Sequence, residues 1–431
     1  MLGGLIELGR LLHNTKRSHE SLRDLQNKKV RAVVRHAYEN VPYYRKLLDS
    51  AGFSPRHLRS IDDLEKLPAS NKSDLRNSHD LLATSMPRDS MFSGTTSGST
   101  GHPFEVYLTQ QEIRFRRLID MRALIGAGVR PLDRIATISA RPHRSLGLHQ
   151  RLLLRADRVL ATDPIEQQLA RLERLRPTIL WAPPSAVFAL LKFTNHDLAA
   201  RCGIRKLVTT AEAVDEKIRR TTEQSQGIRW HNFYGAVETG RIAWQCGQHT
   251  GLHLNVDHVL LEIEPLEHSP ADLDEHFGSA LITTLNQRAM PFLRYRLGDL
   301  CAFEDDARCP CGNRFPLIKP PVGRAADVIV LPSGKYVSPR TVTFIIREIR
   351  GIRAFQIIQE STQKLTILLE AVGELSADEC MRLEKQVVSQ LGEPLKVEVR
   401  IVHRIERVAE KLVEFVSKVR HQDTASVFST I

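Results

Sequence analysis

The stretch IEQQLARLERLRPTILWAPPSAVFALLKFTNHDLAARCGIRKLVTT, residues 165–210, decides the fold of this chain. Short apolar strands alternate here with helical runs, and one further strand precedes them. We place these elements at 134–139, 165–175, 178–181, 185–193 and 206–210. Such alternation is typical of β-α-β units. We therefore expect an α/β domain with a mostly parallel sheet.

Other segments flank this series. The pattern predicts a helix over 27–50, interrupted at Val41–Tyr44, and another over 109–126. Residues 259–303 change to the period-2 alternation of half-buried strands.

The pattern changes again near Gly323. Two strand–helix–strand passages follow, which indicate a compact α+β module with a ferredoxin-like arrangement. Its expected elements are strands at 327–331, 354–359, 364–370 and 395–402, and helices at 339–349 and 376–391. We therefore predict a large domain over 1–322, with a basic helical N-terminus, and a small mobile domain over 323–431.

Composition excludes several classes of protein. The 431 residues are 42% hydrophobic and 26% charged, which is ordinary for globular proteins and excludes disorder, collagen and coiled coils as the main architecture. The longest apolar run, 179–193, contains Pro183, Pro184 and Lys192 and is shorter than the roughly 18 residues of a membrane span. Glu7 and Arg10 would interrupt the apolar region of a signal peptide. We expect a cytoplasmic protein.

The net charge of +11 is concentrated at the N-terminus. Residues 1–60 hold 12 Lys and Arg against 5 Asp and Glu. A basic start can attract nucleic acid or an anionic membrane. No basic stripe with interleaved aromatic residues follows, so we expect a solvated helical face and no nucleic-acid partner. Leu2, Leu5, Ile6 and Leu12 could form the apolar side of a short helix with weak peripheral membrane contact.

The strongest chemical signal is a run of glycine and hydroxyl residues, 93–101. Its exposed backbone N–H groups and hydroxyls suit a polyphosphate, although the Walker A pattern is absent. A flexible linker is the alternative, but the strand-like Glu105–Leu108 follows closely. The candidate phosphate-binding residues are Ser93, Gly94, Thr95, Thr96, Ser97, Gly98, Ser99, Thr100 and Gly101.

A second motif is FYGAVET, residues 233–239. Tyr234 offers a stacking face, and Glu238 offers a carboxylate ligand for Mg²⁺. A strand followed by a capped helix would explain the same residues without any chemistry.

Two further motifs lie downstream. In RYRLGD, residues 294–299, Asp299 could accept hydrogen bonds from two ribose hydroxyls, although a plain β-turn would give the same pattern. In Val322-Gly-Arg324, the guanidinium could contact a phosphate.

Cysteine spacing suggests a metal site rather than disulfides. Cys309-Pro-Cys311 is a C-x-C pair, and Cys246 is followed by His249 and His253. Three thiolates and one imidazole complete a closed tetrahedral Zn²⁺ site, which is typically structural. Spacing alone favours His249, Cys301 is near enough to substitute, and reduced thiols in a core remain the alternative.

The order of these motifs resembles the adenylate-forming (acyl-CoA synthetase) superfamily. The segment HAYENVPYYR at 36–45 and the loop form TSGSTG are similar to phenylacetate–CoA ligases and their CapK-like and coenzyme F390 synthetase relatives. The resemblance spans about residues 28–418.

The resemblance implies a role for each motif. The 93–101 loop would hold the ATP β- and γ-phosphates, and Arg324 would contact the ribose or phosphate region. Tyr234 would stack on adenine, Glu238 would bind Mg²⁺ and Asp299 the ribose hydroxyls. In this branch the zinc-binding histidine follows Gly-Leu, as His253 does. The remaining implied residues are Thr210, Ala211 and Glu212 around the adenine and Lys411 as the C-terminal catalytic lysine.

Two positions depart from the family pattern. Glu410 replaces the glycine that usually precedes the lysine, and Lys418 is a weaker candidate for that role. The acid expected at the hinge is Ala326 here, with Asp327 next. These departures put the domain rotation in question and leave an inactive paralogue as an alternative.

The resemblance implies ATP-dependent activation of a carboxylic acid, followed by transfer to a thiol, most often that of coenzyme A. The acid would be held near Trp181–Ser185, Phe233–Gly235 and the residues before Arg241. Two alternatives remain: an adenylyltransferase that places AMP on a non-carboxylate acceptor, and a non-catalytic basic zinc protein that binds nucleic acid or a membrane surface.

Overall fold

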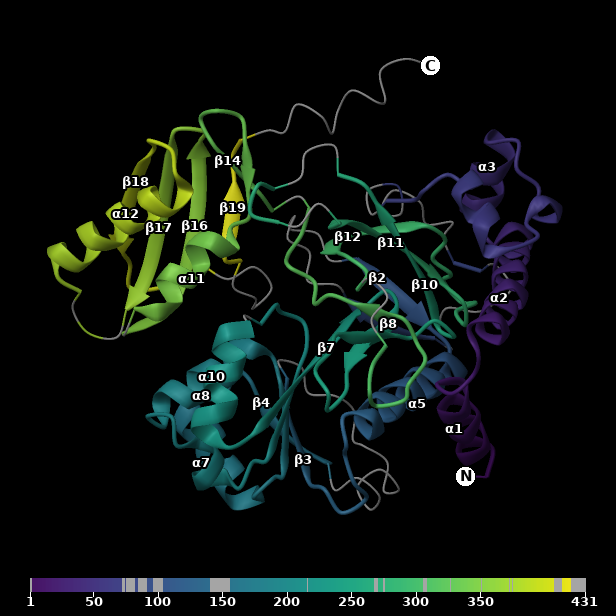
Figure 1. Cartoon of the computed structure of the whole chain (residues 1–431), viewed down its shortest axis with the longest axis horizontal. Helices are drawn as coiled ribbons and strands as arrows, with labels where there is room; N and C mark the ends of the chain where they lie inside the picture. The colour runs from purple at the N-terminus through teal and green to yellow at the C-terminus, as the bar shows by residue number, and fades with distance from the viewer. Residues whose placement is uncertain are drawn as a thin grey trace.

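The structure is a computed structural model. It describes residues 2–71, 74, 82–83, 91–95, 104–139, 156–214, 216–266, 270–273, 276–304, 308–325, 327–349, 351–371, 373, 375–406 and 413–419. A large domain occupies most of the chain, and a smaller domain rich in β-sheet follows it (Figure 1).

An eight-stranded mixed sheet is the centre of the large domain. Its order is β13-β9-β8-β7-β6-β5-β3-β4. The run from β4 to β7 is parallel, as the sequence predicts, and β7, β8, β9 and β13 pair antiparallel. The strands are β3 (Ile135–Ser139), β4 (Ala156–Leu160), β5 (Ile179–Ala182), β6 (Lys206–Thr209), β7 (Arg229–Ala236), β8 (Gly240–Gln245), β9 (Leu252–Leu254) and β13 (Leu317–Ile318).

Amphipathic helices pack on the parallel half of this sheet. Leu169 and Leu172 of α7 and Val187 and Leu190 of α8 are buried in one cluster with Trp230 of β7. Pro184 begins α8 because its fixed φ suits the first helical turn. The helices are α7 (Ile165–Leu175), α8 (Pro184–Phe193), α9 (Leu198–Cys202) and α10 (Glu216–Gln226).

A second, three-stranded antiparallel sheet has the order β10-β11-β12. It confirms the strands predicted within 259–303, although β11 is buried along its whole length and does not alternate. Its strands are β10 (Val259–Glu264), β11 (Gly278–Thr284) and β12 (Tyr295–Cys301), and nearby are the hairpin of β1 (Phe92–Thr95) with β2 (Glu105–Leu108) and helix α5 (Gln110–Gly126).

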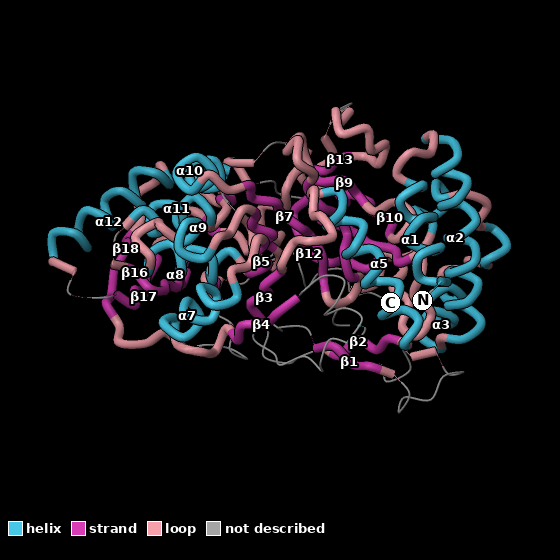
Figure 2. The backbone as a smooth tube through the Cα atoms, turned by 90° about the horizontal axis from the view of Figure 1, so that it is seen from below, coloured by secondary structure: helices cyan, strands magenta, loops and turns pink. Residues whose placement is uncertain are grey.

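The N-terminal helices lie at the end of the molecule farthest from α12 (Figure 2). The expected break at Val41 is confirmed, because this residue is extended and Pro42 starts a new helix. At Asp257 a buried network joins α1 to the core, with Arg122 and Asn14 each 2.7 Å from its carboxylate. The elements are α1 (Leu2–Asn14), α2 (His19–Asn40), α3 (Pro42–Ser50) and the 3₁₀ turns η1 (Pro55–His57) and η2 (Ile61–Lys66).

The C-terminal domain has the predicted α+β composition. Its four-stranded sheet has the order β18-β17-β16-β19, with a central antiparallel hairpin and a parallel strand on each side. This order departs from a split ferredoxin-like arrangement, because β17 and β18, which α12 connects, are direct neighbours. The elements are β14 (Ile329–Val330), β15 (Tyr336–Val337), α11 (Arg340–Glu348), β16 (Ile352–Ser361), β17 (Lys364–Ala371), α12 (Ala377–Leu391), β18 (Lys396–Ile401) and β19 (Phe415–Ser417).

Polar side chains of Asp272 and Lys192 contact the C-terminal domain. Asp272 accepts hydrogen bonds from the Ser338 N–H (2.9 Å) and the Thr341 hydroxyl (2.7 Å), and so binds the start of α11 to the large domain. Lys192, near the end of α8, donates to the Ile352 carbonyl at 2.7 Å. These bonds hold the domain arrangement that the structure shows.

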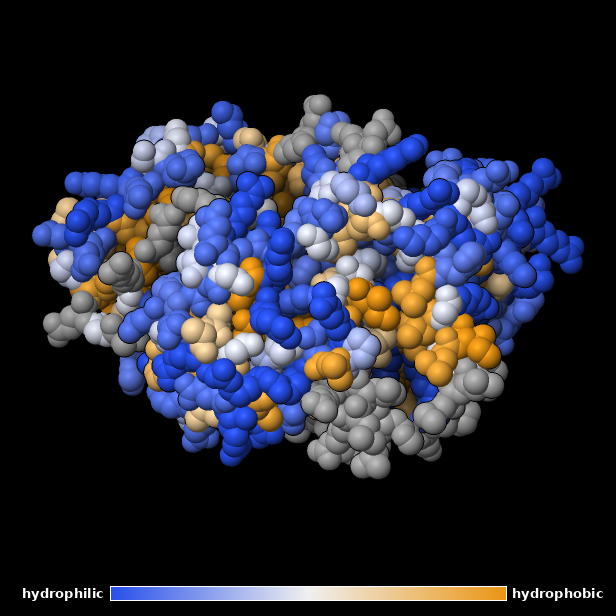
Figure 3. All heavy atoms as spheres, turned by 60° about the horizontal axis from the view of Figure 1, so that its bottom comes forward, coloured by the Kyte–Doolittle hydropathy of each residue, from blue (hydrophilic) through white to orange (hydrophobic). Residues whose placement is uncertain are grey.

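Most of the face shown in Figure 3 is hydrophilic, with apolar side chains gathered in a smaller area. On α1, Leu5 and Ile6 are 66% and 67% exposed, whereas Leu11 is buried. None of the helices within the described ranges is long and apolar enough to cross a bilayer.

Candidate nucleotide-binding and active site

Tyr234 and Asp299 meet where the eight-stranded and three-stranded sheets of the large domain come together. The Tyr234 hydroxyl donates to Oδ2 of Asp299 at 2.8 Å. Burial, and then the neighbouring Asp299 carboxylate, raise the pKa of Tyr234 well above its ordinary value, so the phenol stays protonated and remains a donor.

Asp299 lies inside β12, not at a strand end or in a turn. The β11–β12 register shifts between Ser279 and Leu281, where Gly298 has φ +82°, and this bulge redirects the aspartate. Arg324 is beside it, since the two residues form an antiparallel bridge and Nε of Arg324 is 3.8 Å from Oδ1 of Asp299. The motifs RYRLGD and GR are therefore adjacent in space.

Glu238 occupies the turn between β7 and β8, with no helix following. Its side chain is buried, and Oε1 accepts a 3.4 Å hydrogen bond from the Tyr295 hydroxyl. The guanidinium of Arg116 in α5 donates to the backbone carbonyls of Val237 (2.9 Å) and Glu238 (2.6 Å). The turn is thus held from two sides.

Residues 210–212 follow β6 directly, at the carboxyl end of a parallel strand where α/β folds bind ligands. The Thr210 hydroxyl accepts a 3.0 Å bond from Arg241. Ala211 has φ +76°, which is rare for a residue other than glycine. Glu212 accepts bonds of 2.9 Å from both the N–H and the hydroxyl of Ser185, so it caps α8.

The three segments expected around the substrate acid also converge. The rings of Trp181 and Phe233 lie 5.9 Å apart in an edge arrangement. The Arg241 guanidinium lies over both, 5.5 Å and 5.0 Å from the ring centres, and its Nε donates to Asp120 at 3.0 Å.

The glycine-rich motif begins in a β-hairpin. Ser93, Gly94 and Thr95 belong to β1, which pairs with β2. A Cβ on Gly94 would lie 3.3 Å from the Val237 side chain, so this strand packs closely on the Glu238 turn. Six residues of the motif lie outside the described residues: Thr96, Ser97, Gly98, Ser99, Thr100 and Gly101.

Three other predicted positions, Lys411, Glu410 and Ala326, also lie outside the described residues. The weaker lysine candidate, Lys418, forms an exposed ion pair with Glu360 at 2.5 Å.

The cysteine cluster is assembled. The ligand atoms of Cys246, His253, Cys309 and Cys311 all lie within 4.8 Å of one another. Burial raises the pKa of Cys246 to about 12 and lowers that of His253 to about 4, which leaves the imidazole neutral. His249 lies elsewhere and stacks on His231 with ring centres 5.2 Å apart.

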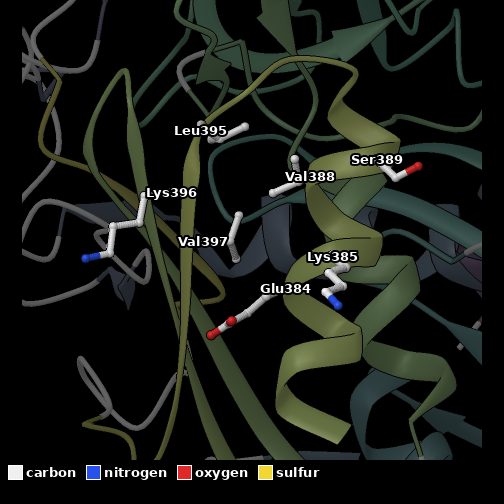
Figure 4. A pocket seen from close by; sticks show the side chains of 7 residues that line it. All are labelled: Glu384, Lys385, Val388, Ser389, Leu395, Lys396 and Val397. Carbon is white, nitrogen blue, oxygen red and sulfur yellow. The ribbon is translucent and has the colours of Figure 1, made fainter. Parts of the chain in front are cut away.

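A separate cleft of about 480 Å³ lies between α12 and β18 (Figure 4). It belongs to the C-terminal domain, and none of the motif residues lines it. Its lining combines aliphatic and charged side chains: Glu384, Lys385, Val388, Ser389, Leu395, Lys396 and Val397.

Sequence reasoning missed Arg116 and the bridging contacts of Arg241. Arg116 belongs to a helix whose sequence gives no sign of reaching another motif. Tyr295 was within reach of sequence analysis, because it is part of the RYRLGD segment.

Solved structures with the same fold are acyl-CoA ligases. A 2-hydroxyisobutyryl-CoA ligase in the postadenylation state with 2-HIB-AMP has a TM-score of 0.76 at 20% identity, over 93% of this chain and 90% of that chain. The same enzyme with 2-HIB-AMP and CoA in the thioesterification state has a TM-score of 0.64 at 21% identity, over 93% and 91%.

Sequence comparison gives the family. A model of the CapK C-terminal domain matches residues 329–416. The phenylacetate-coenzyme A ligase of Thermus thermophilus is 29% identical over 76% of this chain and 75% of that protein. The Escherichia coli enzyme of the same name is 32% identical over 66% of this chain and 67% of that protein. The chain belongs to the phenylacetate–coenzyme A ligase family of adenylate-forming enzymes.

Proposed function

We propose that this chain is an AMP-forming ligase that activates a carboxylic acid with ATP and transfers the acyl group to coenzyme A. The observation that carries this proposal is the convergence of three motifs, in which Tyr234, Asp299 and Arg324 form one contact group. A non-catalytic zinc protein would have no need for this grouping. Family membership supports the same conclusion.

ATP would lie across this contact group. Tyr234 would stack on adenine beside residues 210–212, while the carboxylate of Asp299 would accept the ribose hydroxyls. Each carboxylate oxygen can accept more than one hydrogen bond, so the contacts with Tyr234 and Arg324 leave acceptor capacity. The 93–101 loop would bind the β- and γ-phosphates, since β1 packs against the turn that holds Glu238.

In the first half-reaction, a carboxylate oxygen of the acid attacks the α-phosphorus of ATP. A C–O–P bond forms, the bond to the β-phosphate breaks and pyrophosphate leaves. The buried Glu238 carboxylate is the kind of ligand that Mg²⁺ takes, and the bound ion would offset charge on the phosphate oxygens. The assignment of Lys411 to the same task rests on the family resemblance.

In the second half-reaction, the thiolate of coenzyme A attacks the acyl carbon, and AMP leaves as the thioester forms. Neither step needs a side-chain nucleophile. The acid would bind beside Trp181 and Phe233.

We propose a structural zinc ion bound by Cys246, His253, Cys309 and Cys311. The donor set is three thiols and one imidazole nitrogen, which suits tetrahedral Zn²⁺ and leaves no open position for catalysis. His253 belongs to β9, and Cys309 and Cys311 precede β13, which pairs with β9. The ion would therefore fasten the edge of the large sheet.

We also propose that the domain division lies near residues 322–323 and that the C-terminal domain turns between the half-reactions. Residues 323–325 still contact β12 and β14 starts at Ile329, which supports a hinge just after the predicted division, between residues 325 and 329. Weak peripheral membrane contact through the exposed Leu5 and Ile6 of α1 stays a prediction.

The test is a panel of aryl and aliphatic acids incubated with Mg-ATP, with and without coenzyme A. Pyrophosphate, AMP and thioester are each measured. Thioester formation with at least one acid is the expected result. Pyrophosphate release without any acid dependence would favour an adenylyltransferase with another acceptor, and absence of ATP binding would contradict the proposal.

A further inference from the structure

One arginine of α5 reaches the backbone of the turn that carries Glu238. Arg116 donates from two nitrogens to three oxygens: the carbonyls of Val237 and Glu238 and, at 2.8 Å, the side-chain oxygen of Gln287. Burial lowers the pKa of Arg116 to about 10, so the guanidinium is still charged at neutral pH. Charge-assisted bonds of this kind are stronger than those between neutral groups.

The same helix also holds the other end of the turn. Asp120 lies four residues after Arg116, hence on the same face of α5. It accepts a 3.0 Å bond from Arg241, the second residue of β8. Arg116 and Asp120 therefore bind the segment 237–241 at both ends, and Arg241 also donates a hydrogen bond to Thr210.

The side chain of Arg116 also packs closely against Gly240 in this segment. Gly240 has φ +76°, and a Cβ there would lie 3.2–3.3 Å from the side-chain atoms of Arg116. Glycine is favoured here both by its backbone conformation and by the approach of the arginine.

We propose that Arg116 is a positioning residue for Glu238, which fixes the direction of this carboxylate by holding the two peptide groups on either side of it. The proposal rests on the role given to Glu238 in the proposed function. The 3.4 Å bond from Tyr295 is long, so the backbone contacts are the stronger restraint on the Glu238 turn. A displacement of about 1 Å can reduce a rate by roughly 100-fold.

The experiment measures acid-dependent ATP–pyrophosphate exchange by Arg116→Met, Arg116→Lys and the exposed-neighbour control Arg117→Met. We expect Arg116→Met to lower kcat by about 10- to 100-fold, which is the usual effect of losing a residue that holds a metal ligand in place. The KM values for ATP and acid should stay within about twofold of the wild-type values, as expected when a substituted residue is not coupled to substrate binding. Arg116→Lys should recover part of kcat, because it keeps a charged donor. The melting temperature of each variant shows whether the fold is kept.

A double-mutant cycle separates positioning from general structural damage. If Arg116 acts through Glu238, the loss caused by Arg116→Met should largely disappear in a Glu238→Gln background. The proposal would be overturned by a normal kcat in Arg116→Met, by a change in KM alone, or by a kcat in Arg116→Lys as low as in Arg116→Met. It would also be overturned if the double variant lost kcat by the full product of the two single losses. An inactive wild-type protein would instead contradict the proposed function itself.

Discussion

The hydroxyl of Tyr234 donates a 2.8 Å hydrogen bond to the carboxylate of Asp299 and so joins the eight-stranded sheet to the three-stranded one. Tyr234→Phe removes this bond and keeps the ring. A hydrogen bond to a charged acceptor contributes about 1.5 kcal/mol, so we expect the KM for ATP to rise about tenfold. Tyr38→Phe is the matched control, since Tyr38 donates to Asp49 at 2.9 Å on the exposed surface. An unchanged KM in Tyr234→Phe would separate this bond from nucleotide binding.

The cysteine cluster predicts one zinc ion per chain, measurable by elemental analysis of protein purified without chelator. Cys309→Ser should lose most of this zinc and should unfold at a lower temperature, because binding energy at a structural site contributes to folding. Cys380→Ser, outside the cluster and half-buried, should do neither. Full zinc content in Cys309→Ser would show that the four residues do not form the site.

The contact of Asp272 with the start of α11 predicts how the domain contact opens. Asp272→Ala removes the bonds to the Ser338 N–H and the Thr341 hydroxyl. Hydrogen exchange should then increase in residues 336–348 and also in β16, where Lys192 makes another contact between the domains. Asp378→Ala, an acid in the first turn of α12, is the control. Faster exchange at Ser338 alone would mean that Asp272 restrains only its immediate neighbours.

Stability should decrease below neutral pH because of a buried histidine. Burial lowers the pKa of His258 to about 3 from 6.5, and its Nε2 lies 2.9 Å from the carbonyl oxygen of Thr239. Below pH 6.5 the unfolded chain binds a proton that the folded chain does not. This contribution to stability is therefore complete above pH 6.5 and is lost as the pH falls toward 3, by up to about 1.4 kcal/mol per pH unit.

Urea unfolding at several pH values between these limits tests this effect. The slope of unfolding free energy against pH measures how many protons the chain takes up on unfolding, and His258→Gln should lower this number by about one. An identical dependence in the variant would assign the acid sensitivity to other groups.

The sequence was sufficient for much of the fold, because local patterns determine it. The strand–helix alternation at 165–210 predicts β5, α7, α8 and β6 within a few residues, and Pro42 marks the start of α3. It could not show that Asp299 lies at a bulge inside a strand, because the bulge in β12 depends on pairing with β11. The strand order of the C-terminal domain was likewise beyond local patterns, since α12 connects two strands that then pair directly.

The candidate site was predictable motif by motif but not as an assembly. Tyr234, Glu238 and Asp299 each stand in a short segment with a recognisable residue order. Their contacts join residues far apart in the chain, and Arg116 acts on Glu238 across 122 positions. Nothing in the local sequence of α5 separates Arg116 from Arg117, because only the tertiary fold determines which of them faces the turn.

Formation of an acyl adenylate at this site is measured most directly by the exchange of labelled pyrophosphate into ATP. The exchange is measured with the best acid of the panel and without coenzyme A, for the wild-type chain, Glu238→Gln and Lys411→Ala. We expect exchange that requires the acid and falls by roughly 100-fold or more in both variants. Exchange that proceeds without any acid, or that survives Glu238→Gln unchanged, would contradict the proposed function.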